Sequence, residues 1–147
     1  MNFREAVTAD IKEIQRVRNI VKENVLSNPA LVTDAAVEDY ITRRGKGWVC
    51  EQDRTILGFS IVSIMDNNVW ALFVDPEMER KGIGRKLHDI MLDWYFNTPA
   101  KNIWLSTTPD TRAATFYRKA GWVERGPYGK DEIRFEMSLI DWQRQQK

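Results

Sequence analysis

Cysteine, histidine and net charge are all scarce in this sequence, and each shortage excludes a class of function. Cys50 is the only cysteine, so the chain forms no internal disulfide and no multi-cysteine metal site. His88 is the only histidine, which excludes a histidine-rich metal site and any mechanism that needs two histidines. We therefore predict no metal cofactor, a buried apolar role for Cys50 in a strand, and a structural role for His88.

The balance of charge and the lack of long apolar runs exclude further partners. The 22 basic residues are offset by 21 acidic ones, for a net charge of +1, so the composition does not favour nucleic acid. No run of 18 apolar residues occurs, and residues 1–10 are too polar for a secretory signal. We predict a cytoplasmic protein with neither a nucleic-acid nor a membrane partner.

The residues that are present fit one globular unit. The chain has 147 residues, of which 43% are hydrophobic and 29% charged, as is usual for a domain with one core. It contains no repeat, no low-complexity tract and no linker. We predict a single domain over residues 1–147.

The spacing of apolar and turn-forming residues predicts the order β-α-α-β-β-β-α-β-α-β-β. Helices are expected after the capping residues Thr8 and either Thr33 or Asp34, around residues 87–94, and over residues 110–120. Strands are expected at residues 2–7, 48–51, 56–65, 69–74, 102–107, 122–125 and 133–139. A strand–helix–strand crossover makes 69–74 and 102–107 parallel. The predicted fold class is α+β, with a mixed, mostly antiparallel sheet flanked by helices.

A glycine-rich turn before the third helix is the most informative segment. Residues 80–86 read Arg-Lys-Gly-Ile-Gly-Arg-Lys. Glycine lets the backbone approach a ligand, and the first amides of a helix point outward at the positive end of its dipole, so the turn suits a pyrophosphate. A Walker loop is excluded because no Gly-Lys-Ser/Thr follows, and a dinucleotide fingerprint because Leu87 stands where a third glycine is needed. Taken alone, the turn fits an ordinary tight turn equally well.

Two further segments make the assignment specific. Residues 72–76, just before the turn, read Leu-Phe-Val-Asp-Pro, and residues 110–122 read Asp-Thr-Arg-Ala-Ala-Thr-Phe-Tyr-Arg-Lys-Ala-Gly-Trp. The first segment with the turn resembles the cofactor-binding motif of the GNAT superfamily of acyl-CoA-dependent N-acyltransferases, and the second is similar to that family's second signature. The order of elements agrees with the family fold over essentially the whole chain. The resemblance implies an N-acetyltransferase that moves an acetyl group from acetyl-CoA to a primary amine by direct attack in a ternary complex.

The resemblance also implies how the cofactor is held. Pantetheine would lie in a gap where the parallel strand pair splays, with a backbone amide near Phe73 or Val74 polarising the thioester carbonyl. Tyr117 would lie near the coenzyme sulfur as a proton donor. Glu79 replaces the usual Gln or Arg and is expected to point away from phosphate; Asp110 replaces the usual Asn and either contacts pantetheine or caps its helix. The cofactor-binding residues implied are Leu72, Phe73, Val74, Arg80, Lys81, Gly82, Ile83, Gly84, Arg85 and Asp110.

The acceptor and its general base are less defined. The two splayed strands contain no acidic residue, so the base is left open between Glu23, Glu51 and a chain of water molecules. The loop between the first two helices varies with substrate in the family, which implies Glu23 and Asn24 as acceptor-binding residues, with Trp70 as an aromatic wall. We expect a small-molecule or amino-acid-like amine as acceptor. A protein lysine or N-terminus, a non-catalytic acyl-CoA sensor and a homodimer are left open.

Overall fold

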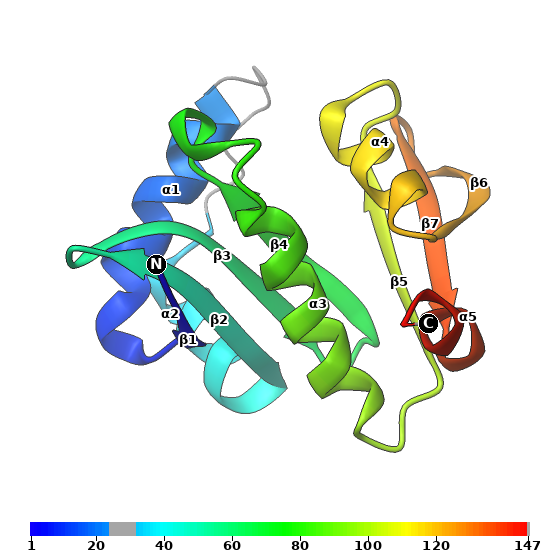
Figure 1. Ribbon diagram of the computed structural model, residues 1–147, viewed down its shortest axis with the longest axis horizontal. Helices are drawn as coiled ribbons and strands as arrows, with labels where there is room; N and C mark the ends of the chain where they lie inside the picture. Colours follow the sequence, from blue (N-terminus) through cyan, green and yellow to red (C-terminus); the bar gives the residue numbers. More distant parts are fainter. Residues whose placement is uncertain (24–31, 147) are drawn as a thin grey trace.

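A computed structural model describes residues 1–23 and 32–146, and its centre is one seven-stranded sheet in the order β1-β2-β3-β4-β5-β7-β6 (Figure 1). The strands are β1 (Asn2–Glu5), β2 (Gly45–Gln52), β3 (Thr55–Ser63), β4 (Asn68–Val74), β5 (Asn102–Thr107), β6 (Val123–Tyr128) and β7 (Glu132–Ser138). All neighbours are antiparallel except β4 and β5, which are parallel. The α+β fold class and the parallel pair predicted from the sequence are confirmed.

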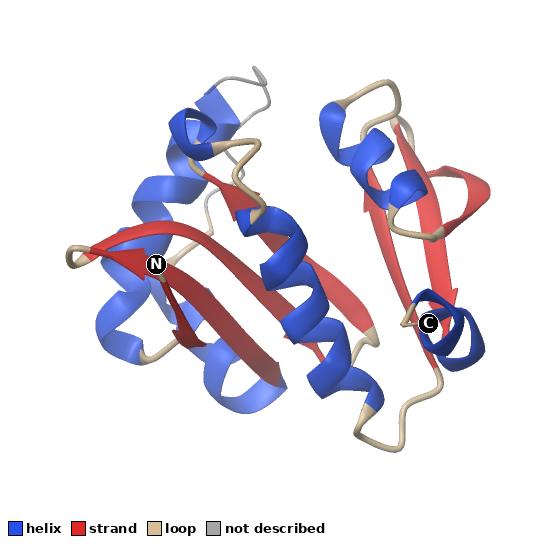
Figure 2. Cartoon of the chain, in the orientation of Figure 1, coloured by secondary structure: helices blue, strands red, loops and turns tan. Residues whose placement is uncertain are grey.

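Helices cover the two faces of the sheet separately (Figure 2). They are α1 (Ile11–Glu23), α2 (Asp34–Asp39), α3 (Ile83–Phe96), α4 (Arg112–Lys119) and α5 (Leu139–Gln145). On one face, α3, α4 and α5 enclose a core that includes Leu87, Met91 and Phe135. On the other face, α1 and α2 bury Ile14, Val17 and Val37 against β2, β3 and β4. Across residues 1–23 and 32–146, no helix is long and apolar enough to cross a bilayer.

The parallel strands β4 and β5 touch at one end only. Asn68 is paired with Trp104, and the Trp104 amide donates to the Asn67 carbonyl over 3.0 Å. Beyond Asn68 no ladder pairs the two strands, and they diverge toward the N-terminal ends of α3 and α4 (Figure 1). The edge of β4 that faces β5 is therefore left without a neighbouring strand from Val69 to Val74.

A bulge in β4 sets which side chains face which layer. Ile61 of β3 is opposite Ala71, whereas Val62 is opposite Val69, so Trp70 is an extra residue on β4. As a result, Trp70 and Phe73 pack with the core under α1, while Leu72 and Val74 pack with the core under α3.

Helix caps differ in part from those expected. Thr33 is confirmed as the cap of α2, because its hydroxyl accepts from the Ala36 amide over 3.1 Å. The Thr8 cap is wrong: a 3-10 turn, η1 (Thr8–Asp10), precedes α1, and the Asp10 carboxylate accepts from the Val7 amide over 2.8 Å.

The C-terminal helix α5 was not predicted, since residues 133–139 read as a strand to their end. Ser138 is the last residue of β7 and also the N-cap residue of α5. Its hydroxyl accepts from the Asp141 amide over 3.1 Å. A serine three residues before an acidic residue was the available signal.

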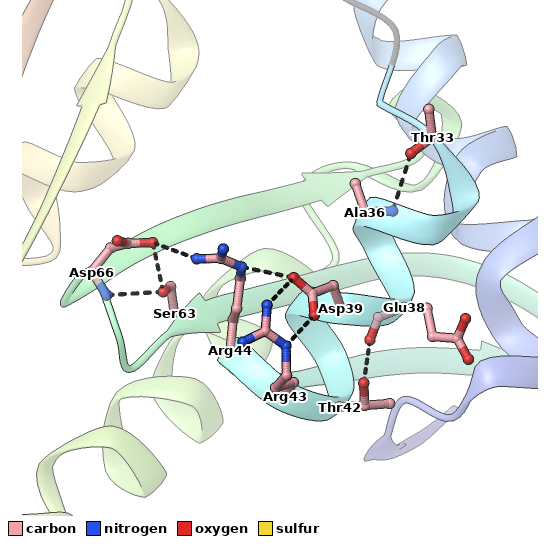
Figure 3. Close-up of polar contacts among 9 residues, drawn as sticks. All are labelled: Thr33, Ala36, Glu38, Asp39, Thr42, Arg43, Arg44, Ser63 and Asp66. Carbon is pink, nitrogen blue, oxygen red and sulfur yellow. Dashed lines mark hydrogen bonds and ion pairs between the residues drawn. The ribbon is translucent and has the colours of Figure 1, made fainter.

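Between α2 and β2 the chain makes a π-helical turn, η2 (Tyr40–Arg44), instead of a simple stop. The Asp39 carboxylate accepts from Arg43 Nε and Arg44 Nε, each over 2.7 Å, and Arg44 also reaches Asp66, 4.0 Å away in the β3–β4 turn (Figure 3). β2 then begins at Gly45, where a Cβ atom would overlap the Val62 carbonyl of β3. This close approach, together with the ion pairs, ties η2 to the sheet.

Candidate active site

The glycine-rich turn forms an open N-terminus for α3. Gly82 is the N-cap residue and has a φ of 80°, a left-handed conformation that favours glycine. None of the described side chains caps the helix, and its first backbone bond runs from the Lys86 amide to the Gly82 carbonyl over 3.1 Å. The amides of the first turn are therefore free to bind an anion.

Gly84 has a different role from Gly82. It lies inside the first turn of α3, and an added Cβ would contact only Val74 Cγ2 at 3.4 Å, an ordinary van der Waals distance. Folding therefore does not require glycine at this position. Close approach of a ligand to the backbone would explain it.

The four cations around the turn are not equivalent. Arg85 pairs with Asp89 over 3.1 Å, and the Lys86 ammonium lies 4.5 Å from the centre of the Phe3 ring. Arg80 and Lys81 are exposed and have no ion-pair partner among the described residues. These two side chains are the better placed for phosphate.

Glu79, the carboxylate next to the turn, forms an ion pair with Arg112. Arg112 is the first residue of α4, so the pair connects the segment before α3 with the helix that follows β5. The negative charge that would oppose phosphate binding is thereby neutralised.

Tyr117 of α4 lies in an aromatic cluster on the α3 side of the sheet. Its ring centre is 5.6 Å from that of Trp122, 6.2 Å from Phe135 and 6.4 Å from His88. Burial raises the pKa of the Tyr117 phenol well above its usual range, so it is protonated at neutral pH.

The Tyr117 hydroxyl has no hydrogen-bond partner among the described residues. In the described part of the chain, no fully buried side-chain oxygen or nitrogen lacks a partner. The hydroxyl is therefore not completely enclosed by protein, although the side chain as a whole is buried. Such a group can donate a hydrogen bond to a ligand.

Asp110 does not cap α4. Thr111 is the N-cap residue, with its hydroxyl accepting from the Ala114 amide over 3.2 Å. Asp110 is exposed and has a φ of 60°, so the capping alternative for this residue is wrong. An N-cap residue has an extended backbone, and in this chain that conformation is found at Thr111 and not at the left-handed Asp110.

On the opposite face of the sheet, Trp70 is part of a stack of two aromatic rings with a guanidinium group at each end. Its ring is parallel to that of Tyr40, with 3.9 Å between centres and 8° between planes. Arg18 Cζ lies 5.7 Å from the centres of the Trp70 and Phe73 rings, and Arg44 Cζ lies 5.6 Å from that of Tyr40. We call Arg18, Trp70, Tyr40 and Arg44 the aromatic–arginine stack.

The acidic residues considered as bases are in different situations. Glu51 accepts from Arg4 Nε over 3.2 Å and lies on β2, two strands away from β4. Glu23 is the last residue of α1, but its side chain lies outside what the structure describes, as does the whole of Asn24.

Arg18 and Tyr40 were missed by the sequence reasoning. Arg18 is one helical turn from Ile14, which is on the buried stripe of α1, and an arginine next to that stripe was the available signal. No sequence signal pointed to Tyr40, because its position depends on the π-helical turn.

Comparison with known proteins agrees with this geometry. A family model described as the acetyltransferase (GNAT) family matches residues 12–122. No curated protein matches the chain in sequence.

Many solved structures share the fold. A PaiA N-acetyltransferase from Thermoplasma acidophilum, in complex with coenzyme A, is 17% identical with a TM-score of 0.81, over 94% of this chain and 98% of that one. The ribosomal-protein-S18-alanine N-acetyltransferase from Escherichia coli is 17% identical with a TM-score of 0.75, over 94% and 93%. Ard1 from Thermoplasma volcanium is 20% identical with a TM-score of 0.76, over 94% and 97%. At these identities the likeness establishes the fold.

Proposed function

The chain belongs to the GNAT family of acetyltransferases, and from that premise we propose that it transfers the acetyl group of acetyl-CoA to the primary amine of a small molecule or amino-acid-like metabolite, by direct attack in a ternary complex. The observation that carries the proposal is the divergence of β4 from β5 beside the open N-terminus of α3. The free edge of β4 suits an extended pantetheine arm, and the uncapped amides suit a pyrophosphate.

The residues of this chain then have separate tasks. Leu72, Phe73 and Val74 lie along the pantetheine, and the amide of Val74, at the edge of β4 away from β3, stabilises the negative charge that develops on the acetyl oxygen. Residues 80–85 hold the pyrophosphate through amides, assisted by the unpaired charges of Arg80 and Lys81. Acetyl-CoA itself supplies the activated thioester.

Tyr117 donates a hydrogen bond to the departing sulfur in this proposal. The bond between carbon and sulfur breaks as the bond between carbon and nitrogen forms, and a proton passes from the amine to the thiolate. A phenol with an ordinary pKa near 10 is already a weaker acid than a thiol near 8.5. The raised pKa of Tyr117 therefore favours a hydrogen bond, or relay of the proton from the amine, over outright donation.

The amine must lose a proton, because a primary amine with a pKa near 10.4 is neutral in only about one molecule in several thousand at pH 7. Glu51 is a poor candidate for this base, since Arg4 engages it two strands from β4. We propose Glu23, at the end of α1, or water.

A panel of amines with acetyl-CoA tests the function, read by release of free thiol and by the mass of the product. Acetylation of small amines with saturation kinetics is the expected result. Binding of acetyl-CoA without transfer to any amine would instead identify a sensor.

A protein acceptor is the second candidate. It is suggested by two solved structures of this fold that are named ribosomal-protein-alanine N-acetyltransferases, at 17% and 18% identity. Peptides with free N-termini and peptides with internal lysines belong in the same panel. A peptide that outcompetes every small amine would reverse the assignment.

A further inference from the structure

We propose that Arg18 binds a carboxylate of the acceptor, so that the preferred acceptors are amines that also carry a carboxylate group. This inference rests on the proposed function, which supplies the amine and the site of transfer. It adds the second recognition element and the residue that provides it.

Arg18 differs from every other partly buried arginine in the described chain. Four of these arginines have a carboxylate within 4.0 Å: Arg4, Arg16, Arg44 and Arg134. Arg18 has no ion pair and no hydrogen bond with any described residue. A partly desolvated guanidinium with no anion beside it is unfavourable, which points to an anion that arrives with a ligand.

The segment that follows α1 has no acidic side chain. Residues 24–31 contain no Asp or Glu. Glu23 is on the same helix as Arg18, but positions five residues apart are about 140° apart around a helix axis, on different faces. Neither the described residues nor the composition of residues 24–31 provides a carboxylate for Arg18.

The ring contacts of Arg18 leave its donors available. A cation–π contact with Trp70 and Phe73 uses the charge of the guanidinium and none of its five N–H groups. Arg44, at the other end of the aromatic–arginine stack, also lies over a ring, yet it is paired with Asp39 over 2.7 Å. Arg18 is therefore positioned by aromatic rings and keeps the fork geometry that binds a carboxylate with two parallel hydrogen bonds.

The position of Arg18 fits the acceptor side of the sheet. The open N-terminus of α3 and the Tyr117 cluster are on one side of β4, and Arg18 is on the other, over Phe73. An amine that attacks at the free edge of β4 from the α1 side would bring its own carboxylate toward Arg18. Burial lowers the pKa of Arg18 from its usual value, as expected for a cation that lacks an anionic partner.

Matched acceptor pairs test the inference. Each pair is an amino acid and its carboxamide, and the series includes α-amino acids and ω-amino acids of increasing chain length. For the best pair, wild-type kcat/KM should favour the carboxylate by about 10- to 100-fold, the range expected for hydrogen bonds to a charged group. Arg18→Gln should remove that preference, with most of the change in the KM of the acceptor and little in the affinity for acetyl-CoA.

Two further variants keep the result interpretable. Lys12→Gln removes one positive charge from an exposed position of the same helix and should keep the preference. Arg18→Lys keeps the charge without the planar fork and should retain a weaker preference, which decides the matter if Arg18→Gln fails to fold by circular dichroism.

The outcomes separate this inference from the proposed function. If amines are acetylated but carboxylate and carboxamide react equally well, or if Arg18→Gln slows both members equally, Arg18 is not a carboxylate site and the acetyltransferase assignment is unaffected. If no amine of any pair is acetylated, the acceptor assignment and this inference are both wrong.

Discussion

The indole of Trp122 donates a hydrogen bond from Nε1 to Nε2 of His88 over 2.9 Å, in the interior of the α3 side of the sheet. An indole N–H can only donate, so His88 Nε2 must carry a lone pair and the imidazole proton is on Nδ1. That proton faces Asp89 Oδ1, 2.8 Å away. The only histidine is thus neutral and buried, and it connects α3 with Trp122 in the short segment between α4 and β6, which fits the structural role expected of it.

This arrangement predicts a pH dependence of stability. Burial lowers the pKa of His88, with Asp89 opposing the shift and Arg85 adding to it, whereas in the unfolded chain the value is near 6.5. The unfolded state therefore binds more protons, and the free energy of unfolding should fall as the pH drops below about 6.5, by at most about 1.4 kcal/mol per pH unit.

His88→Gln is the matched comparison, because its amide oxygen can still accept from Trp122 and does not titrate. Urea unfolding followed by tryptophan fluorescence should give a constant difference between the two proteins above pH 7.5 and a loss in the wild type alone between pH 6.5 and 5. If the free energies of unfolding of the two proteins change in parallel over this range, the pKa of His88 is not lowered by folding.

Gly84→Glu should weaken acetyl-CoA binding more than tenfold, because it adds bulk and a negative charge beside the proposed phosphate site. The fold should survive, since a carboxylate in the first turn of a helix interacts favourably with the helix dipole. Gly84→Ala is the control for folding, as its methyl group meets only Val74 at 3.4 Å. Calorimetric titration measures both variants, and an unchanged affinity in Gly84→Glu would remove the phosphate site from this turn.

Tyr117→Phe should keep the affinity for acetyl-CoA. It should lower kcat about 10²-fold if the hydroxyl relays a proton to the departing sulfur or stabilises it by a hydrogen bond. The ring contacts with Trp122 and Phe135 remain in this variant, so packing is preserved. The measurement is kcat at saturating acceptor.

Tyr95→Phe is the control for loss of a buried hydroxyl. The Tyr95 hydroxyl donates to the Asn102 carbonyl and accepts from Asn67, each over 2.6 Å, near the closed end of the β4–β5 pair. Its loss should lower stability and leave kcat unchanged. A kcat for Tyr117→Phe equal to the wild type would assign Tyr117 to packing alone.

Glu23→Gln should lower kcat/KM for the acceptor and leave acetyl-CoA affinity unchanged, because no acidic residue is present on β4 or β5 to remove the amine proton. Glu51→Gln is the matched control: it removes the negative charge that pairs with Arg4 and should affect stability without affecting catalysis. Steady-state kinetics on both variants decide the matter, and normal acceptor kinetics in Glu23→Gln would leave water as the base.

Local patterns in the sequence were sufficient for the order of the elements from β1 to β7 and for the glycine turn before α3. Apolar spacing and turn residues act over a few positions, so they predicted β5 at its observed bounds and the helices on either side of it. Gly82 is needed by its own backbone conformation, which is also a local requirement. Ser138, in contrast, ends β7 and caps α5. The residues around it read as a continuous strand, so α5 was not predicted.

The sequence by itself therefore determined the class of fold, the glycine turn and the absence of disulfides, because these depend on composition and short-range spacing. Only the tertiary structure decided which distant residues meet. The bond between Trp122 and His88 joins positions 34 apart, and the unpaired charge of Arg18 is evident only once α1 is packed on Trp70 and Phe73. Such contacts depend on how the helices pack on the twisted sheet and on the bulge at Trp70. Neither produces a periodic pattern of residues in the sequence.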